Sequence, residues 1–374
     1  MHVALNAHLL SGDPSYRSAG VHQYIYHLLL YLPDAGCRVT AFLGPRGTLP
    51  GGAARVVRSR WPTDRRAARA VWEQVAQPWV LRWVEADLAH GPVFVGPLVA
   101  PCPFIVTVHD LSFLRFPHLF RPANRLYLGV LTRASVRRAR RVIAVSAHTA
   151  EETVRLLGVE REKVDVVYHG VGSEFRPLPP EEVRAFRVRK GLPERYVLCV
   201  GTLEPRKNLA RLVEAFARLR EPGLKLVLAG GRGWYNEEIF TRVEQLGLRE
   251  GVVFPGYVPG RELPYWYNTA TVFAYPSLCE GFGMPVLEAQ ACGVPVLTSD
   301  CSALPEAAGD GALLVDPCNV GAVAEGLQRL LTDEALRETL RQRGLAHAAR
   351  FTWQQTAAET VAVYRRALTE DRSE

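Results

Sequence analysis

The sequence predicts an α/β protein of two doubly wound domains in series, and three observations support this. The chain has 374 residues, which suits two hydrophobic cores better than one. Short β-branched apolar runs alternate with longer helical stretches, as in βαβ units around a parallel sheet. The alternation stops at residues 176–180, Arg-Pro-Leu-Pro-Pro, which can continue neither a helix nor a central strand, and then starts again.

Seven strands are expected before this linker and six after it. The first series is His2–Asn6, Arg38–Leu43, Ala54–Val57, Ala86–His90, Phe104–His109, Arg141–Ser146 and Val164–Tyr168. The second is Tyr196–Gly201, Leu224–Ala229, Val252–Pro255, Thr271–Tyr275, Val294–Thr298 and Ala312–Val315. Helices are expected at Leu209–Leu219, at Asn236–Leu246, near Glu262–Asn268 and from Pro285, and Ser146 is placed to cap another.

The domain boundaries follow from this pattern. We expect an N-terminal Rossmann-like domain at 1–175 and a C-terminal Rossmann-like domain at 176–350. The tail is expected to be helical from Val320 to Leu368, with breaks near Gly344 and at Phe351-Thr-Trp. Its last helix, 351–374, is expected to pack back on the first domain.

Composition excludes several classes of protein. The chain is 48% hydrophobic and 22% charged, which is typical of a folded protein rather than a disordered or fibrous one. Because it has no apolar run of membrane-spanning length, and because Met1 leads directly into an apolar strand, we expect a cytoplasmic protein. The seven cysteines form no Cys-x-x-Cys pair, so we expect buried free thiols and no metal site.

The positive charge lies in the N-terminal half. Residues 1–185 hold 23 Lys and Arg against 15 Asp and Glu, while residues 186–374 hold 22 against 23. Arg38–Arg69 and Arg115–Arg141 carry most of the excess. Such stretches suit anionic lipid headgroups, a phosphorylated acceptor or nucleic acid, and a solvated basic face remains an equal alternative.

The segment from Ser277 to Glu288 carries the first chemical signal. It follows a buried strand, contains glycines at 281 and 283, and leads through Pro285 into a helix. The N-terminus of a helix attracts phosphate and sugar oxygens, and carboxylates beside it can accept from ribose or hexose hydroxyls. Glu280 is expected in the loop and Glu288 in the first helical turn. The alternative is that Glu288 only complements the helix dipole and Glu280 is solvated.

Cations follow a neighbouring strand. In the segment Gly201–Asn208, Arg206 and Lys207 lie between a strand end and a helix start, where α/β sheets bind ligands. Two adjacent cations match a diphosphate, although a lone Arg-Lys pair is usually a surface pair.

Two N-terminal segments add weaker signals. His109 closes an apolar strand, where it could donate to a sugar hydroxyl or interact with a developing charge, with Asp110 orienting it, or could be a structural histidine. Arg17-Ser-Ala19-Gly20-Val21 precedes a helix and could present amides to a phosphate.

Taken together, these segments resemble the retaining nucleotide-sugar glycosyltransferases of the large family four. The resemblance covers nearly the whole chain and is most specific between Val253 and Pro317. That stretch contains Phe-Pro-Gly-Tyr-Val, glutamates at 280 and 288, Ala-Cys-Gly-Val-Pro-Val, Leu-Pro-Glu306 and Leu-Leu-Val-Asp-Pro. It implies the GT-B fold, in which two Rossmann-like domains face each other across a cleft, with the acceptor on the first and the donor on the second.

The resemblance also implies residue roles. Glu288 is expected to hold the ribose hydroxyls, Glu280 to contact the donor sugar, and Arg206 and Lys207 to neutralise the departing diphosphate. The remaining donor contacts implied are the amides of Phe282, Gly283 and Met284, the turn at Tyr257 and Val258 beside the base, His109 against the sugar and Gly20 over the phosphates.

Two departures from the family pattern bear on these roles. The chain has Gly201-Thr202 where many members have Gly-Arg, so the leaving-group charge is expected to fall on Arg206. At Ala19–His22 a second glycine common in the family is missing.

The expected reaction therefore moves a hexose, with mannose favoured, from a nucleotide sugar to a saccharide or lipid-linked acceptor. GDP-mannose is the favoured donor and a UDP-sugar the alternative, with no cofactor, no metal and no nucleic-acid partner. The basic face suggests peripheral contact with an anionic membrane at its inner face. An epimerase or phosphorylase of the same fold, or a non-catalytic nucleotide-sugar-binding protein, remain alternatives, and a Rossmann dehydrogenase ranks lower because Gly-x-Gly-x-x-Gly is missing after the first strand.

Overall fold

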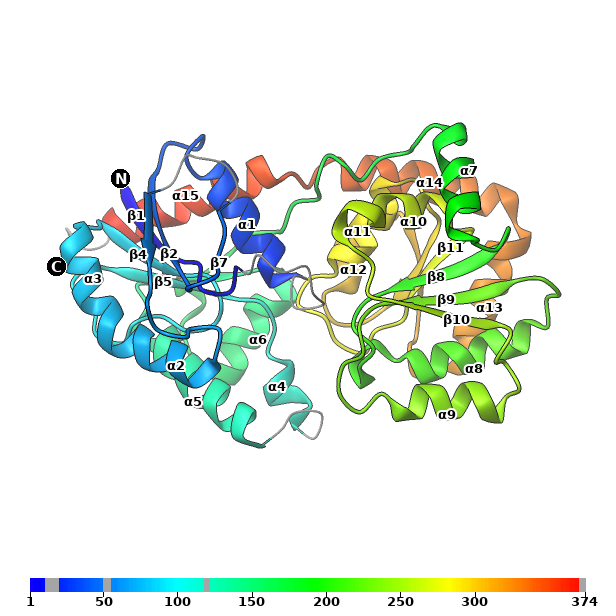
Figure 1. The fold of residues 1–374 in the computed structure, drawn as a ribbon, viewed down its shortest axis with the longest axis horizontal. Coiled ribbons are helices and arrows are strands. Elements are labelled where there is room, and N and C mark those ends of the chain that lie inside the picture. Colours follow the sequence, from blue (N-terminus) through cyan, green and yellow to red (C-terminus); the bar gives the residue numbers. More distant parts are fainter. Residues whose placement is uncertain (11–19, 50–54, 118–121, 370–374) are drawn as a thin grey trace. The chain divides into compact units, whose positions relative to one another are not determined.

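The computed structural model describes residues 1–10, 20–49, 55–117 and 122–369. The chain forms two compact units, shown in Figure 1. One comprises Met1–Gly170 together with the C-terminal segment from Thr352, and the other comprises Val171–Phe351.

The first unit contains a seven-stranded sheet in the order β3-β2-β1-β4-β5-β6-β7, with every pair parallel. Its strands are β1 (His2–Asn6), β2 (Arg38–Leu43), β3 (Arg55–Arg58), β4 (Leu88–Gly91), β5 (Phe104–Val108), β6 (Arg141–Ala144) and β7 (Val164–Val166). The strand order reverses between β1 and β4. In open α/β sheets such a reversal opens a crevice at the carboxyl ends of the two strands, where ligands bind.

Helices cover this sheet on both faces (Figure 1). They are α1 (Val21–Tyr31), α2 (Arg66–Val71), the π-helical turn η2 (Trp72–Ala76), α3 (Gln77–Val84), α4 (Ser112–Arg115), α5 (Pro122–Arg138), α6 (Ala147–Leu157), the 3₁₀ turn η4 (Arg161–Lys163) and α15 (Trp353–Thr369). Ser146 caps α6 as predicted, because its side chain accepts from the Thr149 amide. The core between sheet and helices includes Phe42, Val106 and Phe113.

The last helix, α15, belongs to the first unit. Tyr364 on α15 hydrogen-bonds with His90 Nδ1 at 2.8 Å, and both side chains are fully buried. Arg366 donates to Asp165 of β7 at 2.7 Å, and Trp353 stacks on His27 of α1. Because these contacts reach β4, β7 and α1, the chain's last helix is part of this unit's core rather than a loose tail.

The second unit contains a six-stranded parallel sheet in the order β10-β9-β8-β11-β12-β13. Its strands are β8 (Tyr196–Val200), β9 (Lys225–Ala229), β10 (Val252–Gly256), β11 (Val272–Tyr275), β12 (Val296–Ser299) and β13 (Ala312–Val315). This is the Rossmann order, and its reversal lies between β8 and β11.

The helices of the second unit also lie on both faces of its sheet (Figure 1). They are α7 (Pro180–Lys190), η5 (Pro205–Lys207), α8 (Leu209–Leu219), α9 (Glu237–Gln245), η6 (Gly260–Glu262), α10 (Leu263–Thr269), α11 (Met284–Ala291), α12 (Leu304–Ala308), α13 (Val320–Thr332) and α14 (Glu334–Ala348). The prediction for α8 is confirmed at both ends. Several predicted strands run too far, so that His109, Ser146 and Gly201 lie just beyond the strands expected to contain them.

The expected break near Gly344 is wrong. α14 passes through Gly344, and the helical tail is interrupted instead at Asp333, whose side chain caps α14. Gly344 has another reason to be glycine: a Cβ there would lie 3.1 Å from Gln290 Cγ on α11. The residue permits close packing of two helices rather than ending one.

The prediction of buried thiols holds only in part. Cys37, Cys199, Cys279 and Cys292 are buried, but Cys102 and Cys301 are half-buried and Cys318 is exposed. Within the described residues, no helix is long and apolar enough to cross a membrane.

Candidate functional site

The residues predicted to bind a ligand in the second unit gather at the reversal point of its sheet. Arg206 and Lys207 lie in η5, which follows β8, and Glu280 lies in the loop that follows β11. β8 and β11 are adjacent, so their carboxyl ends bring the two segments together. A backbone hydrogen bond of 2.8 Å from the Leu278 amide to the Arg206 carbonyl joins the segments directly.

Glu280 binds both predicted cations at once. Arg206 Nη1 donates to Glu280 Oε2 at 2.7 Å, and Lys207 Nζ donates to Glu280 Oε1 at 2.6 Å. Lys207 also donates to the Tyr275 hydroxyl at the end of β11. Glu280 and Lys207 are both buried, so the carboxylate holds the two cations in fixed positions.

A fourth charge completes this cluster. Arg206 Nε donates to Glu204 Oε1 at 2.6 Å, and Glu204 is buried. The formal charges of Glu204, Arg206, Lys207 and Glu280 therefore sum to zero. The sequence placed two adjacent cations here to match a diphosphate, and the structure shows a balanced set of four charges, named here the charge cluster.

The charge cluster keeps Glu280 ionised. Burial alone would raise its pKa, but Arg206 and Lys207 outweigh burial and lower the pKa of Glu280 to about 2. Ser302 fixes the backbone beside it, since its hydroxyl donates to the Glu280 carbonyl at 2.7 Å and accepts from the Glu280 amide at 2.9 Å.

The N-terminus of α11 lies beside the charge cluster. Gly283 is the N-cap, Met284 begins the helix and Pro285 follows, so the helix starts one residue earlier than predicted. Gly283 has φ +115°, and a Cβ there would lie 2.8 Å from Leu304 Cδ2 on α12. Glycine is therefore needed for backbone geometry and for packing. Phe282 is buried, and its ring lies 5.9 Å from that of Phe351.

Glu288 lies on the same helix, in the second turn rather than the first. Its Oε2 accepts from the Tyr267 hydroxyl at 2.8 Å. Burial raises the pKa of Glu288 to about 7, although the bond from Tyr267 opposes the rise. At neutral pH the Glu288 carboxyl is therefore close to the midpoint of its titration, while Glu280, in the loop before this helix, is fully ionised.

Tyr257 and Val258 follow the outermost strand, β10, at the same edge of the sheet. Tyr257 is exposed and Val258 is buried. Since neighbouring strands lie about 4.8 Å apart, the end of β10 is roughly 10 Å from that of β8 along the edge. The spacing suits an elongated ligand that extends from the charge cluster toward Tyr257.

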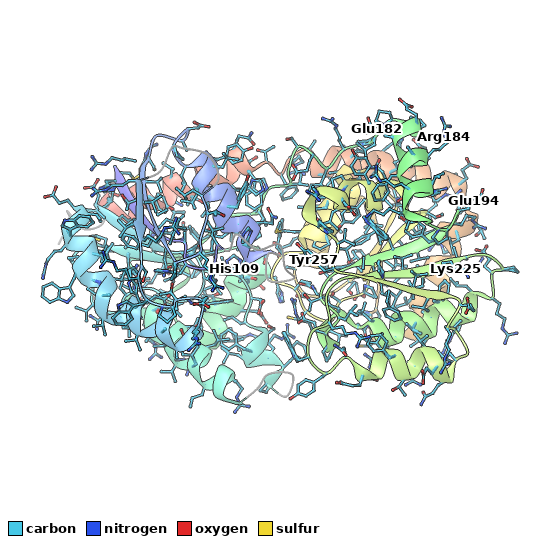
Figure 2. All side chains as sticks on the ribbon, viewed as in Figure 1. His109, Glu182, Arg184, Glu194, Lys225 and Tyr257 are labelled. Atoms are coloured by element: carbon cyan, nitrogen blue, oxygen red, sulfur yellow. The ribbon has the colours of Figure 1, made fainter. Side chains whose placement is uncertain are left out.

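His109 and Gly20 belong to the first unit; Figure 2 labels His109 there and Tyr257 in the second unit. His109 is buried, and its Nε2 lies 2.8 Å from the Pro92 carbonyl, which can only accept. Burial lowers the pKa of His109, so the ring is neutral at pH 7 and its Nδ1 is a hydrogen-bond acceptor.

The predicted role of Asp110 is not what the structure shows. Its Oδ1 accepts from the Ser112 amide at 2.9 Å and from the Ser112 hydroxyl at 2.5 Å, so it shapes the start of α4. The Pro92 carbonyl, rather than Asp110, orients His109. Gly20 is the residue before α1, with φ +20°, and residues 17–19 of its predicted loop lie outside the described residues.

Sequence reasoning missed four partners of the predicted residues: Glu204, Tyr267, Tyr275 and Ser302. Glu204 stands inside the segment identified as cation-bearing, and its position two residues before Arg206 could have indicated a pair. Tyr267, Tyr275 and Ser302 come from other elements, so only the fold brings them to the site. Among the described residues no group of His, Cys, Asp and Glu could hold a metal ion.

Comparison with known proteins identifies the class. A model for "Glycosyltransferase Family 4" matches residues 18–175, and one for "Glycosyl transferases group 1" matches residues 182–347. O-antigen chain mannosyltransferase B of Escherichia coli is 35% identical over 298 residues, which are 77% of this chain and 77% of that protein. The serotype-specific mannosyltransferase WbdA of Escherichia coli is 31% identical over 78% of this chain but only 37% of its own length.

Solved structures agree on the fold. Sucrose-phosphate synthase from Thermosynechococcus elongatus superposes with a TM-score of 0.83 at 22% identity, covering 99% of this chain and 100% of that one. Anabaena HepE in complex with UDP-glucose gives 0.76 at 21% identity, covering 97% and 100%. The protein is thus a glycosyltransferase with the GT-B fold. It belongs to glycosyltransferase family 4, as the sequence resemblance implied.

Proposed function

We propose that this glycosyltransferase moves a hexose, with mannose favoured, from a nucleotide-sugar donor to a saccharide or lipid-linked acceptor, with retention of configuration. The product belongs to glycan or polysaccharide biosynthesis. The observation that supports the proposal most is the charge cluster at the reversal point between β8 and β11, beside the N-terminus of α11. Dinucleotide-type ligands bind at such points in open α/β sheets.

The charge cluster suits the departure of a diphosphate. Glycosyl transfer separates charge, since an oxocarbenium-like sugar forms while the diphosphate leaves. Arg206 and Lys207 are held in place by Glu280 before any ligand binds, so they need little rearrangement to stabilise the developing negative charge. Lys207 has three N–H donors, and the described residues take two of them. The third is assigned to a phosphate oxygen.

The donor's other parts are assigned along the same edge. Glu288 holds the ribose hydroxyls, the backbone of Phe282, Gly283 and Met284 meets the sugar and diphosphate, and the base lies beside Tyr257 and Val258. Gly20 closes over the phosphates from the first unit. His109 contacts the donor sugar through Nδ1, as an acceptor rather than a donor.

Retention of configuration fits a reaction in which the acceptor attacks the sugar on the same face from which the leaving group departs. The leaving phosphate then acts as the base. No residue is assigned as a nucleophile. A retaining hydrolase uses two carboxyl groups about 5 Å apart on either side of the bond, and here Glu280 is committed to two cations.

GDP-mannose is proposed as the donor because curated relatives at 35% and 31% identity are mannosyltransferases. A UDP-sugar is the alternative, since Anabaena HepE of the same fold is seen with UDP-glucose. Family membership favours transfer over the epimerase, phosphorylase and sensor alternatives.

Contact with an anionic membrane is also proposed, and one surface supports it. Val71, Val75, Trp79 and Trp83 are 49%, 56%, 69% and 67% exposed, and they recur at four-residue intervals along the continuous helical segment α2-η2-α3. The guanidinium groups of Arg55 and Arg82 lie over the Trp83 and Trp79 rings, at 5.0 Å and 5.9 Å. Tryptophan and arginine together are typical of helices that lie in a membrane interface.

The basic stretch 115–141 supports membrane contact less than its composition suggested. Arg115 forms an ion pair with Glu152 at 3.1 Å, and Arg141 forms one with Asp165 at 2.7 Å. The stretch has no acid of its own, but the fold brings acids to it from α6 and β7.

Acceptor-dependent release of nucleoside diphosphate tests the proposed function. The protein is incubated with GDP-mannose or UDP-glucose, alone and with methyl α-glycosides of mannose, glucose, galactose and N-acetylglucosamine. Release that requires a glycoside, with an α-linked product from an α-linked donor by NMR, is expected. Release without a glycoside, or an inverted product, contradicts the proposal.

A further inference from the structure

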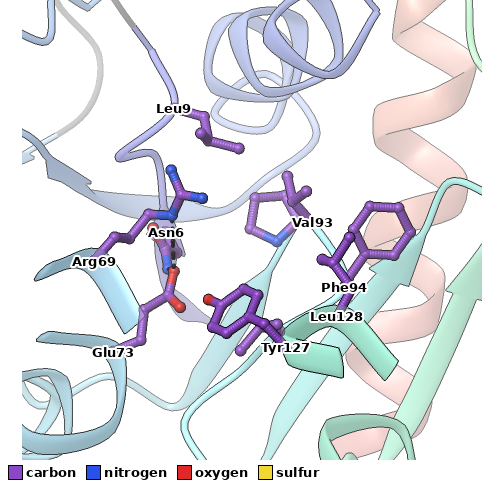
Figure 3. Close-up of a pocket in the computed structure, with 10 residues that line it drawn as sticks. Asn6, Leu9, Arg69, Glu73, Val93, Phe94, Tyr127 and Leu128 are labelled. Atoms are coloured by element: carbon purple, nitrogen blue, oxygen red, sulfur yellow. Dashed lines mark hydrogen bonds and ion pairs between the residues drawn. The ribbon is translucent and has the colours of Figure 1, made fainter. Parts of the chain in front are cut away.

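A small pocket lies at the reversal point of the first unit's sheet, and none of the residues that line it is assigned to the donor (Figure 3). Asn6 closes β1 and Pro92 follows β4, so the pocket lies at the carboxyl edge where the strand order reverses. Arg69 and Glu73 from α2 and η2 form one wall, and Tyr127 from α5 forms another. Its volume is about 50 Å³, which is room for one or two groups the size of a water molecule.

Glu73 lies in this pocket with one oxygen unsatisfied. The residue is 5% exposed, and its Oε1 accepts from Asn6 Nδ2 at 2.9 Å. Arg69 Nε approaches the same oxygen only to 3.8 Å. The buried Oε2 has no hydrogen-bond partner among the described residues. A buried carboxyl oxygen without a partner destabilises a protein, so its presence favours a ligand that supplies the missing donor.

The local backbone supports the same conclusion independently. Glu73 lies in η2, a π-helical turn between α2 and α3. π-helical turns are rare and occur frequently at functional sites. Along this helical segment Trp72 is buried while Val75 is exposed, so the turn directs Glu73 inward from a segment whose opposite side faces solvent.

The chemistry of the walls specifies the ligand class. Asn6, Arg69, Glu73 and Tyr127 provide polar atoms, while Pro92, Val93, Val95 and Leu128 provide apolar surface. A sugar has both features, since its ring presents hydroxyl groups at its edge and C–H groups on its faces. The pocket volume admits a hydroxyl or hydroxymethyl group rather than a whole ring.

The pocket also adjoins His109. Pro92 lines the pocket, and its carbonyl accepts from His109 Nε2. Phe94 lines the pocket too, and its ring lies 5.9 Å from that of His109. A group bound beside Glu73 therefore lies close to the one residue of this unit assigned to the donor sugar.

We propose that this pocket is an acceptor subsite, in which Glu73 Oε2 pairs with one hydroxyl or hydroxymethyl group of the acceptor saccharide. The inference rests on the proposed glycosyl transfer. It makes Glu73 a residue that selects the acceptor and gives it no part in binding the donor. Burial raises the pKa of Glu73 to about 7, and both ionisation states can pair with a hydroxyl, one by accepting and the other by donating.

The test compares Glu73→Leu, which has a similar volume and no hydrogen-bonding atoms, with Glu73→Gln and with the control Glu151→Gln on the exposed side of α6. The probes are the methyl glycoside that the wild type uses best and its monodeoxy derivatives. In Glu73→Leu the KM for the glycoside is expected to rise roughly ten- to hundredfold, since a hydrogen bond to a charged group is lost, with the donor KM unchanged. The wild type should discriminate against one monodeoxy derivative, and Glu73→Leu should not.

Three other results are informative. If Glu73→Leu fails to fold, Glu73→Gln must still show weaker discrimination against that same derivative. If both folded variants keep the wild-type acceptor KM and the wild-type pattern, the pocket holds only water and the inference is overturned while the proposed function stands. If the wild type itself uses no glycoside with any sugar nucleotide, both proposals are overturned.

Discussion

Arg206 and Glu280 form an ion pair, with 2.7 Å between Nη1 and Oε2, that joins the loops after β8 and β11. Arg206 Nη1 also donates to the Cys279 carbonyl at 3.0 Å, so the guanidinium is attached to the second loop at two points. The donor site proposed here depends on this connection, because it sets the position of the cation before the ligand arrives.

Replacing Glu280 by Gln should separate binding from turnover. The charge cluster changes from zero to +1, and Lys207 loses its buried counter-charge. Unfolding free energy is expected to fall by roughly 3–5 kcal/mol, as when one partner of a buried pair is removed. Turnover should fall, while free nucleoside diphosphate binds at least as tightly and with a steeper salt dependence. Chemical denaturation, steady-state kinetics and calorimetry measure these effects, with exposed Glu194→Gln as the control.

The roles assigned to Glu288 and Arg206 predict different kinetic defects. Glu288→Ala should raise the donor KM, because ribose binding is lost in both the ground and transition states. Arg206→Ala should mainly lower kcat, because the diphosphate gains charge as it departs. Initial rates over a range of donor concentrations distinguish the two variants. If both variants show the same small change in donor KM and in kcat, the roles assigned to Glu288 and Arg206 are wrong.

The raised pKa of Glu288 predicts a pH-dependent stability. Between about pH 4.5 and pH 7 the folded state keeps the proton that the unfolded chain has released. The unfolded state then binds fewer protons, so this group's contribution to stability declines as pH rises through that window. Urea denaturation at several pH values should show Glu288→Gln gaining stability relative to the wild type as pH rises. A difference that is constant with pH argues against the raised pKa.

Gly283 should tolerate no side chain. Gly283→Ala places a Cβ against Leu304 at φ +115° and is expected to cost more than about 2 kcal/mol of unfolding free energy. The matched control is Gly191→Ala at the end of α7, where φ is +60° and no atom lies within 4 Å of the added Cβ. It should cost only about 1–2 kcal/mol, from backbone strain alone. Equal losses in the two variants would mean that packing against α12 contributes nothing.

The exposed side chains of Val71, Val75, Trp79 and Trp83 predict membrane binding that depends on both Trp and lipid charge. Wild-type protein should float with vesicles containing phosphatidylglycerol and much less with vesicles of phosphatidylcholine alone. The double variant Trp79→Ser and Trp83→Ser should lose flotation, while Val188→Ser, 82% exposed on α7, should keep it. Flotation that is equal in all three proteins, or in none, contradicts the proposed contact.

Much of the fold follows from local sequence. Helix α8 has the same ends as predicted, because its apolar residues recur at helical spacing after a strand and a turn. Strand ends were less predictable. His109 and Gly201 each follow an apolar run directly, but they lie one residue beyond the ends of β5 and β8. The helical tail is interrupted at Asp333 rather than at Gly344. A glycine in a helical stretch can mark either the end of the helix or close packing against a neighbouring helix, and the sequence alone does not distinguish the two.

The candidate site was predictable where its residues follow strand ends. Arg206, Lys207 and Glu280 could be placed at one edge because β8 and β11 are neighbours in a Rossmann sheet. Their pairing could not be predicted, because a sequence does not say whether a carboxylate faces a ligand or a nearby cation. Glu73 could not be predicted, since an acid within a helical stretch is usually solvated. Its burial, the missing partner of Oε2 and the π-helical turn distinguish it, and all three come from the structure.

The central claim is that the second unit binds a sugar nucleotide at the charge cluster and along α11. Thermal unfolding of the wild type and of Glu288→Ala, each with GDP-mannose, UDP-glucose and no ligand, tests it most directly. A ligand that binds the folded state raises the unfolding temperature. The wild type should be stabilised by at least one sugar nucleotide, with GDP-mannose favoured, and Glu288→Ala should lose most of that gain. No shift with any sugar nucleotide, or equal shifts in both proteins, would contradict the claim.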